Sequence, residues 1–404
     1  MSTNSNQNGH HPFEGNIILF KGLSQYDVLR YFADDLYEGF KELGCNAVVV
    51  DLTAPGAAEE LKALLAQPIF FVLGFNGVGI DLKAGNRSLY DACGFPFFAF
   101  LVDHPLYHLE RLKSNVQNLI VSCVDQKHVE FLKQYENLVC SKAFIPHGAR
   151  QYAEPRPFSE RKYRLVFAGT YVDPDNVRKE WLGFDRHLAQ LLDDAAERAV
   201  HDPNRTLPEV LQALLNEKGL GENPVYLRKL TGLLHLLDRY VRAKRRVMVL
   251  EALAEFPLHV FGNGWDRLRL SGSHHLVIHP SVSYNDMQQI MCDTQMMLSV
   301  LPNFQYGGHE RIFSSMLAGA VSLTDTNAYL EQHFRPGQDF VPFSLSQLNT
   351  LRERVGTLLE DTAAMEEIAG SGRAAVLRGH LWKHRAERIV EAAKFHYTFY
   401  PLHM

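Results

Sequence analysis

The segment that decides the fold is residues 306–325, with the sequence YGGHERIFSSMLAGAVSLTD. Paired glycines at 307–308 precede a short amphipathic segment whose apolar residues recur at helical spacing. Gly319 follows that segment as glycine often follows a helix end, and residues 321–324 have the composition of a buried strand that ends at Asp325. The pattern indicates an α/β unit with an anion site at the helix start, where free N–H groups and the helix dipole favour phosphate.

Length and composition set broad bounds. The chain has 404 residues, of which 46% are hydrophobic and 22% are charged, so it is a globular protein for which two domains are expected. The formal net charge of 41 − 46 = −5 gives no case for nucleic-acid binding. No apolar run approaches the roughly 20 residues that span a bilayer, so no transmembrane segment is expected.

Cysteine usage and the N-terminus bear on location and on metal chemistry. The five cysteines are dispersed without a CxxC pair, which is typical of reduced thiols in a cytoplasmic protein. Residues 1–15 are polar, lack an apolar signal core and are expected to form a disordered leader. Neither the cysteines nor the histidines have the spacing of a zinc site, so no metal is predicted.

The first half of the chain alternates short apolar runs with helical segments. Buried strands are expected at 16–20, 46–52, 69–74, 97–102, 119–123 and 142–145. This alternation predicts a parallel sheet with helices on both faces and ligands beyond the carboxyl ends of the strands. We assign residues 16–155 to this N-terminal Rossmann-like domain, because the polar, proline-containing segment 155–162 marks a boundary.

The second half repeats the pattern around an interruption. Strands are expected at 164–169, 258–261, 276–279, 296–300, 321–324 and 340–343, and helices between the first two strands at 181–200, 207–217 and 226–253. Residues 160–375 thus form a second Rossmann-like domain with a helical insertion at about 175–250, and residues 376–404 are expected to form a C-terminal helix that crosses back to the first domain. The predicted fold class is α/β, with two doubly wound Rossmann-like domains facing a cleft.

Asp103 and His104 are candidate catalytic residues of the first domain. They directly follow an expected strand, where a carboxylate or an imidazole can act as general base on an acceptor hydroxyl. The alternative is an aspartate-initiated turn fixed by Pro105. The sequence leaves both interpretations open.

The charged triplet 309–311 (HER) is the strongest candidate in the second domain. His309 or Arg311 can neutralise a diphosphate, and Glu310 can accept hydrogen bonds from sugar hydroxyls. The alternative is an exposed helix N-terminus whose glutamate suits the helix dipole. The surrounding glycine turn, helix and strand favour the functional interpretation.

Other features of the second domain have both functional and structural interpretations. Residues 167–169 (FAG) and 262–265 (GNGW) each fit close approach of the backbone to a ligand, or a tight turn after a strand. The Lys/Arg run within 226–253 is either a solvated helix face or a surface that docks an anionic acceptor or a membrane.

These second-domain motifs resemble the GT-B glycosyltransferases, and most closely the CgeB-like (spore-maturation-protein-type) group. Three pieces match in order: the strand-end glycine in 167–169, the turn FGNGW at 261–265, and the run HERIF…MLAGA…LTD at 309–325. The segment LWKHRAERI at 381–389 is similar to that group's closing helix. The resemblance covers about 160–400, whereas the helical insertion has no counterpart in it.

The resemblance implies transfer of a sugar from a nucleotide-sugar donor to a hydroxyl acceptor on a protein, glycan or other surface polymer, without a metal or another cofactor. The catalytic candidates, taken from the residue patterns above, are Asp103, His104 and Glu310. It implies a donor site made of Gly169, Gly262, Gly264, Trp265, Val282, Tyr284, Gly307, Gly308, His309, Arg311, Phe313, Ser314 and Asp325.

One position departs from the family pattern. Ser314 stands where many related transferases have an acidic residue that holds the ribose, and the two-glutamate pattern of many retaining enzymes is missing.

Two other functions share the architecture. A nucleotide-sugar epimerase would isomerise its sugar without an acceptor, and a non-catalytic nucleotide-sugar-binding protein would bind the donor without turnover.

Overall fold

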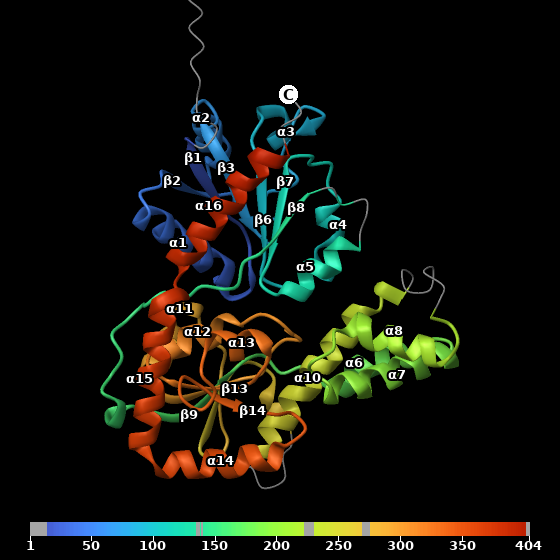
Figure 1. The fold of residues 1–404 in the computed structure, drawn as a ribbon, viewed down its shortest axis with the longest axis vertical. Helices are drawn as coiled ribbons and strands as arrows, with labels where there is room; N and C mark the ends of the chain where they lie inside the picture. Colours follow the sequence, from blue (N-terminus) through green and yellow to red (C-terminus); the bar gives the residue numbers. More distant parts are fainter. Residues whose placement is uncertain (1–13, 135–137, 139, 222–229, 269–274, 401–404) are drawn as a thin grey trace, which may run out of the picture. The chain divides into compact units, whose positions relative to one another are not determined.

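The structure is a computed structural model that describes residues 14–134, 138, 140–221, 230–268 and 275–400. The chain forms two compact units (Figure 1). Unit 1 comprises Met1–Cys123, Val129–Ile145 and Trp382–Met404, and unit 2 comprises Val124–His128 and Pro146–Leu381. Residues 1–13 of the predicted leader lie outside the described residues.

Unit 1 is built on a six-stranded parallel sheet in the order β2-β1-β3-β6-β7-β8. Its strands are β1 Asn16–Lys21, β2 Ala47–Asp51, β3 Ile69–Phe75, β6 Phe97–Leu101, β7 Leu119–Cys123 and β8 Ser141–Phe144. Every residue of β6 and β7 is buried, because helices cover both faces of the sheet. A small hairpin, β4 Lys83–Ala84 and β5 Arg87–Ser88, was not predicted from the sequence.

The helices of unit 1 come from both ends of the chain. They are α1 Val28–Glu42, α2 Ala57–Leu64, α3 Leu89–Cys93, α4 Leu109–Leu112, α5 Gln126–Lys133, whose first turn belongs to unit 2, and α16 Trp382–Phe399. The C-terminal helix α16 packs on α1, where Gly39 leaves room for the backbone of Trp382 and the ring of Phe32 lies 5.4 Å from the Trp382 ring. Aromatic packing thus fixes the last helix to unit 1.

Unit 2 has a second six-stranded parallel sheet, in the order β11-β10-β9-β12-β13-β14. Its strands are β9 Tyr163–Ala168, β10 Leu258–Phe261, β11 Val277–His279, β12 Thr294–Ser299, β13 Val321–Asp325 and β14 Val341–Phe343. Leu165 and Phe167 enter one apolar cluster, and Val166 and Ala168 enter another, so both faces are covered. The strand order reverses between β9 and β12, which is where open α/β sheets bind ligands.

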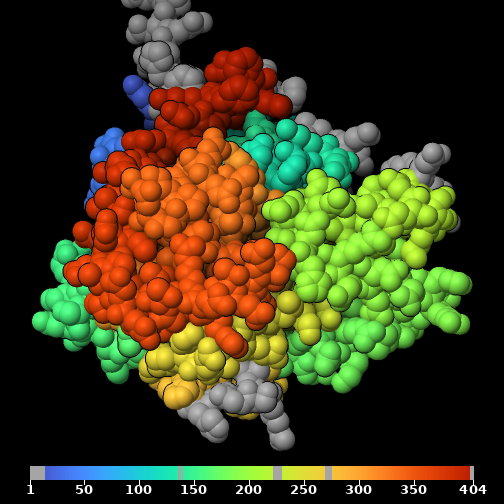
Figure 2. All heavy atoms as spheres, turned by 60° about the horizontal axis from the view of Figure 1, so that its bottom comes forward, coloured from blue at the N-terminus to red at the C-terminus, as the bar shows by residue number. Residues whose placement is uncertain are grey.

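The helices of unit 2 include the predicted insertion. They are α6 Pro174–Leu182, α7 Arg186–His201, α8 Leu207–Glu217, α10 Leu234–Ala252, α11 Tyr284–Cys292, α12 Glu310–Leu317, α13 Ala328–His333, α14 Leu348–Glu360 and α15 Thr362–Gly379. The prediction of a single helix over 181–200 is wrong. The helical conformation is interrupted after α6 and resumes after Asp185, whose side chain caps α7. Figure 1 shows the insertion to one side of the sheet of unit 2, and Figure 2 shows it in green beside the orange atoms of the same unit. Residues 226–229 of the helix predicted over 226–253 lie outside the described residues.

Two further findings concern the chain as a whole. All five cysteines are free thiols. Within the part of the chain that the structure describes, no helix is long and apolar enough to cross a membrane.

Candidate functional site

The loop between β12 and α12, residues 301–309, forms the centre of the candidate donor site; we call it the donor loop. Its first residue is held by Asp325, whose carboxylate accepts a hydrogen bond of 2.7 Å from the Leu301 N–H. Burial raises the pKa of Asp325 to about 6. Asp325, a predicted donor residue, therefore fixes the loop from the end of the neighbouring strand.

Asn327 holds the middle of the donor loop. Its side-chain amide donates to the carbonyl groups of Phe304 and Gly307, each at 2.9 Å. The same residue caps α13 by accepting from the Leu330 N–H at 3.1 Å. Because Asn327 is buried, these bonds are shielded from water and constrain the loop strongly.

Asp125 holds the donor loop from a segment distant in sequence. Its carboxylate accepts 2.8 Å and 2.7 Å bonds from the N–H groups of Tyr306 and Lys127, and burial raises its pKa to about 6. The Gln126 N–H also donates to the Tyr306 carbonyl at 3.0 Å. Gly307 lies so close to this segment that a Cβ there would collide with the Val124 carbonyl. Gly307 is thus required by packing, whatever ligand the loop binds.

The next residues shape the start of α12. A Cβ at Gly308 would collide with the ring of Phe313, which is itself buried and stacked on His380 at 5.2 Å. His309 is the N-cap, and its Nδ1 accepts from the Arg311 N–H at 3.3 Å. The histidine thereby occupies one of the N–H groups that the sequence interpretation left free for phosphate.

Glu310 lies between two nitrogen-bearing side chains. It contacts His309 and is 3.4 Å from Arg311 Nε. Burial lowers the pKa of His309, and the neighbouring Glu310 carboxylate acts in the opposite direction. For Glu310, burial acts to raise the pKa, but the contacts with His309 and Arg311 outweigh it and keep the carboxylate ionised.

Arginines gather where the strand order reverses. Arg311 donates to the carbonyl of Ala168, the last residue of β9, and Arg246 of α10 reaches the Thr170 carbonyl at 3.5 Å. Burial lowers the pKa of Arg246 to about 9, and the positive charges of Arg242 and Arg311 act in the same direction. A site in which neighbouring positive charges lower the pKa of an arginine favours the binding of an anion.

The predicted glycine turn 262–265 packs against the residues that follow β9. A Cβ at Gly262 would collide with the Gly169 carbonyl, which accepts a 2.6 Å hydrogen bond from Trp265 Nε1. The Trp265 ring is buried against Tyr171 at 5.1 Å. Gly264 adopts a φ of +87°, which glycine tolerates best. These contacts give Gly169, Gly262, Gly264 and Trp265 structural roles, and their donor contacts stay predictions.

Ser314 lines a small pocket with Tyr152, Gln288 and Cys292. Its side chain is 98% buried, and its Oγ has no hydrogen-bond partner among the described residues. The ring of Tyr284, at the start of α11, lies 5.9 Å from that of Tyr152. A ribose role for Ser314 stays a prediction.

The remaining predicted donor residue on this side, Val282, packs on an apolar cluster of the sheet, together with Ala153 and Ile290. The loop that carries it is tied to the glycine turn, because the Ser281 N–H donates to Asn263 Oδ1 at 3.3 Å. The loop that carries Val282 is therefore fixed to the turn that packs on Gly169.

The first unit places Asp103 at the carboxyl edge of its sheet. Asn76 donates to Asp103 at 2.9 Å and accepts from the Val102 N–H at 2.9 Å, and its own carbonyl accepts from Arg111 at 2.8 Å. His108 Nε2 lies 3.9 Å from Asp103, and burial lowers the pKa of His108. About half of the Asp103 side chain is exposed, so a substrate can reach it.

His104 has a structural contact instead. Its Nδ1 accepts a 3.1 Å hydrogen bond from the Leu106 N–H, and its ring packs edge-on against Phe131 at 4.8 Å. A nitrogen that caps a turn is a poor proton acceptor for a substrate. Of the two candidate bases, Asp103 is the better placed.

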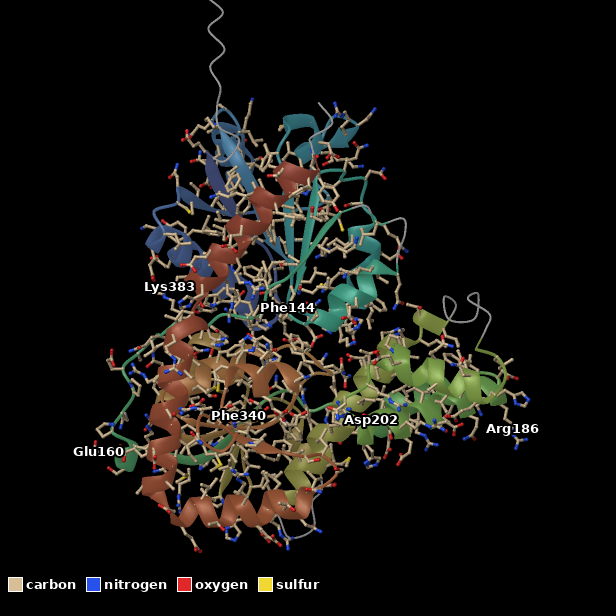
Figure 3. The ribbon with its side chains drawn as sticks, in the orientation of Figure 1. Phe144, Glu160, Arg186, Asp202, Phe340 and Lys383 are labelled. Carbon is tan, nitrogen blue, oxygen red and sulfur yellow. The ribbon has the colours of Figure 1, made fainter. Side chains whose placement is uncertain are left out.

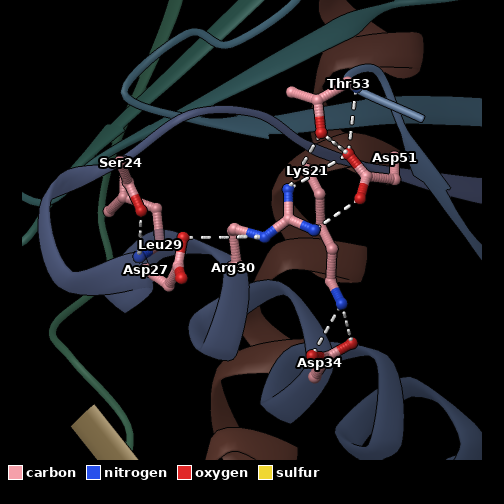
Figure 4. Close-up of polar contacts among 8 residues, drawn as sticks. All are labelled: Lys21, Ser24, Asp27, Leu29, Arg30, Asp34, Asp51 and Thr53. Atoms are coloured by element: carbon pink, nitrogen blue, oxygen red, sulfur yellow. Dashed lines mark hydrogen bonds and ion pairs between the residues drawn. The ribbon is translucent and has the colours of Figure 1, made fainter. Parts of the chain in front are cut away.

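The charges at the ends of β1 and β2 are paired (Figure 4). Lys21 donates to Asp34 at 2.7 Å. Arg30 forms a bidentate pair with Asp51, one bond of which is 3.0 Å, and this pairing lowers the pKa of Asp51. Thr53 also donates to Asp51 at 2.6 Å. This part of unit 1 has little charge left to attract an anion.

Two contributors were missed by the sequence interpretation: Asp125 and Arg246. Asp125 follows a strand, a position that the sequence does reveal. Arg246 belongs to a basic run that was interpreted as a solvated face or a docking surface, although its neighbour Arg245 is buried. Among the described residues, no group of three or more His, Cys, Asp or Glu side chains is placed to hold a metal ion.

Known proteins resemble part of the chain in sequence and nearly all of it in fold. Residues 242–391 match the family model described as glycosyl transferase-like, a range that contains Arg246 and the triplet 309–311. Among curated proteins, none matches the chain.

Solved structures resemble the chain over nearly its whole length. An α-glucosyltransferase in complex with UDP-glucose and DNA containing an abasic site has a TM-score of 0.55 at 11% identity, over 94% of this chain and 99% of that chain. A glycosyltransferase involved in avilamycin A biosynthesis has a TM-score of 0.50 at 11% identity, over 94% and 97% of the two chains. The chain has the GT-B fold of glycosyltransferases, and its residues 242–391 match a glycosyl transferase-like family model.

Proposed function

We propose that the protein is a glycosyltransferase of the CgeB-like type, which moves a sugar from a nucleotide-sugar donor to a hydroxyl acceptor on a protein, glycan or other surface polymer. The observation that carries the proposal is the pair Arg246 and Arg311, which lie where the strand order of unit 2 reverses. Parallel sheets bind ligands at this position, and two guanidinium groups there suit a diphosphate.

In this mechanism the chain stabilises the leaving group. Cleavage of the bond between sugar and diphosphate leaves negative charge on the diphosphate, and Arg246 and Arg311 are fixed in advance to balance it. Glu310 stays ionised and can accept hydrogen bonds from sugar hydroxyls. Because the donor loop is fixed by Asp125, Asp325 and other buried side chains, little reorganisation is needed during the reaction.

Asp103 is the proposed general base in unit 1. Its carboxylate takes the proton of the acceptor hydroxyl as the bond to the sugar forms. Asn76 fixes the carboxylate by a 2.9 Å hydrogen bond, and His108 lies beside it. His104, whose Nδ1 caps a turn, is not assigned this role.

The partners and cofactor needs follow from the same proposal. Two arginines supply the positive charge that other transferases obtain from a metal ion, so we propose activity without a metal. Activity that is retained in excess chelator would support this proposal.

The dispersed free cysteines support a cytoplasmic location. UDP is the first nucleotide to test, because a structural neighbour contains UDP-glucose.

Calorimetry with nucleoside diphosphates tests the proposal. Arg246→Met is expected to weaken binding by about 10- to 100-fold, since hydrogen bonds to charged groups contribute about 1.5–3 kcal/mol. Arg239→Met is the matched control on the same helix, because Arg239 forms an exposed pair with Glu180 at 2.9 Å. If no nucleoside diphosphate binds, or if Arg246→Met binds like wild type, the proposal is wrong. Sugar release without an acceptor would distinguish an epimerase by its isomerised product, and binding without turnover would indicate a non-catalytic protein.

A further inference from the structure

The inner end of the helical insertion contains a buried arginine. Arg245, on α10, is 2% exposed, and its Nε donates to the Val200 carbonyl at 3.2 Å while a second nitrogen donates to the Ala199 carbonyl. Both carbonyls lie in the last turn of α7, where helix carbonyls lack partners within the helix. Arg245 thus caps the C-terminal end of α7.

The same guanidinium group reaches the donor loop. Arg245 Nη1 donates to Asn303 Oδ1 at 2.8 Å, and Asn303 Nδ2 donates to Asp238 Oδ1 at 2.6 Å. Asn303 is buried, and its φ of +56° lies in the left-handed region that non-glycine residues seldom adopt. A side chain bound at both ends holds this backbone conformation in place.

A second contact joins the insertion to the donor loop. Gln305 Nε2 donates to the carbonyl of Arg205, which lies between α7 and α8, at 3.3 Å. Figure 3 places Asp202 at the inner end of the insertion, near the sheet of unit 2, and Arg186 at its outer end. Both contacts with the loop therefore come from the inner end, and the rest of the insertion extends away from it.

We propose that the helical insertion sets the geometry of the donor loop through Arg245 and Asn303, which act as positioning residues. The loop continues from Asn303 to Tyr306 and His309, so its conformation fixes where α12 begins. What the loop binds rests on the proposed function, whereas the coupling itself rests on these contacts alone.

The physical basis is the cost of an unsatisfied buried charge. A guanidinium group removed from water must keep its hydrogen bonds. The end of α7 and the donor loop therefore cannot separate unless Arg245 becomes exposed to water or stays buried without its hydrogen-bond partners. Asp238 adds to this link, because it also lies 3.3 Å from Arg242, whose positive charge acts on Arg246. A movement of α7 is thereby transmitted to the donor loop and to α10 together.

Hydrogen exchange tests the coupling without any ligand. Asn303→Gly keeps the left-handed backbone accessible and removes the side-chain bonds, and Arg245→Lys keeps the charge but not the planar fork. In both variants the amides of Leu301 and Tyr306 are expected to exchange about 3- to 30-fold faster than in wild type, the range for residues that couple two sites. Arg239→Met, nearer the start of α10 and paired with Glu180, should leave them unchanged.

The outcomes separate the inference from the proposed function. Faster exchange confined to the donor loop and the α7 end supports the inference, and unchanged exchange, or faster exchange spread over all of unit 2, overturns it. If wild type binds nucleotide, the KM for the donor should rise about 3- to 30-fold in Asn303→Gly with a smaller change in kcat. A purely structural role would lower the amount of folded enzyme and leave KM unchanged. Failure of wild type to bind any nucleoside diphosphate would refute the proposed function, and the exchange result would still decide the coupling.

Discussion

The carboxyl ends of the two parallel sheets differ in how they treat charge. In unit 1, Lys21 and Arg30 are paired with Asp34 and Asp51, near the surface. In unit 2, the half-buried arginines Arg242, Arg246 and Arg311 outnumber the two carboxylates, Asp238 and Glu310, that act on Arg246. A shared architecture therefore does not imply a shared ligand site. The ligand that a site binds depends on which of its charged side chains lack a full counter-charge.

The largest effect is expected from Asp103, the exposed carboxylate of unit 1. Asp103→Asn keeps an acceptor for the Asn76 amide but cannot take a proton, so kcat should fall by about 100- to 10,000-fold. The affinity for the donor nucleotide should not change. Steady-state kinetics together with calorimetry measure both quantities.

His104→Asn is the control for Asp103. Asparagine can still accept the Leu106 N–H, so the turn should persist and kcat should stay near wild type. A large loss of kcat in His104→Asn with normal activity in Asp103→Asn would reverse the assignment of the base.

A second large effect is expected from Arg311 in unit 2. Arg311→Met removes a fixed positive charge from the proposed diphosphate site, so kcat/KM should fall by about 100- to 1,000-fold. Arg373→Met is a matched control, because Arg373 donates to the Leu317 carbonyl at the opposite end of α12 at 3.0 Å. Equal losses in the two variants would show that Arg311 acts through the stability of the helix and not through the donor.

The fold was largely predictable because parallel sheets buried on both faces leave continuous apolar runs. The predicted strand 97–102 corresponds to β6 Phe97–Leu101, all of it buried, and the predicted strand 119–123 is identical with β7. The hairpin of β4 and β5 was missed because strands of two residues leave no periodicity. The break between α6 and α7 depends on one side-chain cap, at Asp185.

The candidate site was only partly predictable. The triplet 309–311 is local in sequence, so its position at a helix start could be predicted. Asp125 lies 181 residues from the Tyr306 amide that it binds, and Arg246 lies 76 residues from Thr170. A long-range contact of this kind leaves no spacing in the sequence. Periodicity likewise does not show whether Trp265 faces a ligand or the core.

Unit 2 should respond to pH through its buried carboxylates. Burial raises the pKa of Asp325 from an ordinary value of 3.8 to about 6, so the folded state binds the proton more tightly than the unfolded state. Its contribution to stability is fully present below pH 3.8 and is lost as the pH rises through about 6. Relative to Asp325→Asn, wild type should lose up to about 3 kcal/mol of unfolding free energy between pH 4 and pH 7.

Tryptophan fluorescence during urea unfolding measures this loss in each unit. In a Trp382→Phe background the remaining tryptophans, Trp181 and Trp265, lie in unit 2. Asp339→Asn is the control of opposite sign: burial acts to raise the pKa of Asp339, but hydrogen bonds from Arg335 and Ser371 outweigh it and lower that pKa, so its stabilisation is lost as the pH falls. The same pH trend in both variants would contradict the assigned cause.

The smallest effect is expected from the paired charges of unit 1. Lys21→Met breaks the pair with Asp34, whose side chain is 44% exposed, so the unfolding free energy should change by about 0–1 kcal/mol and less at high salt. A double-mutant cycle with Asp34→Asn, followed by Trp382 fluorescence, isolates the pair from the loss of the lysine stem. Donor affinity and kcat should both stay near wild type, because a lysine that is already neutralised contributes little to an anion site. If Lys21→Met lowered kcat/KM as far as Arg311→Met does, the charges of unit 1 would belong to the site, and the contrast between the two sheet ends would not hold.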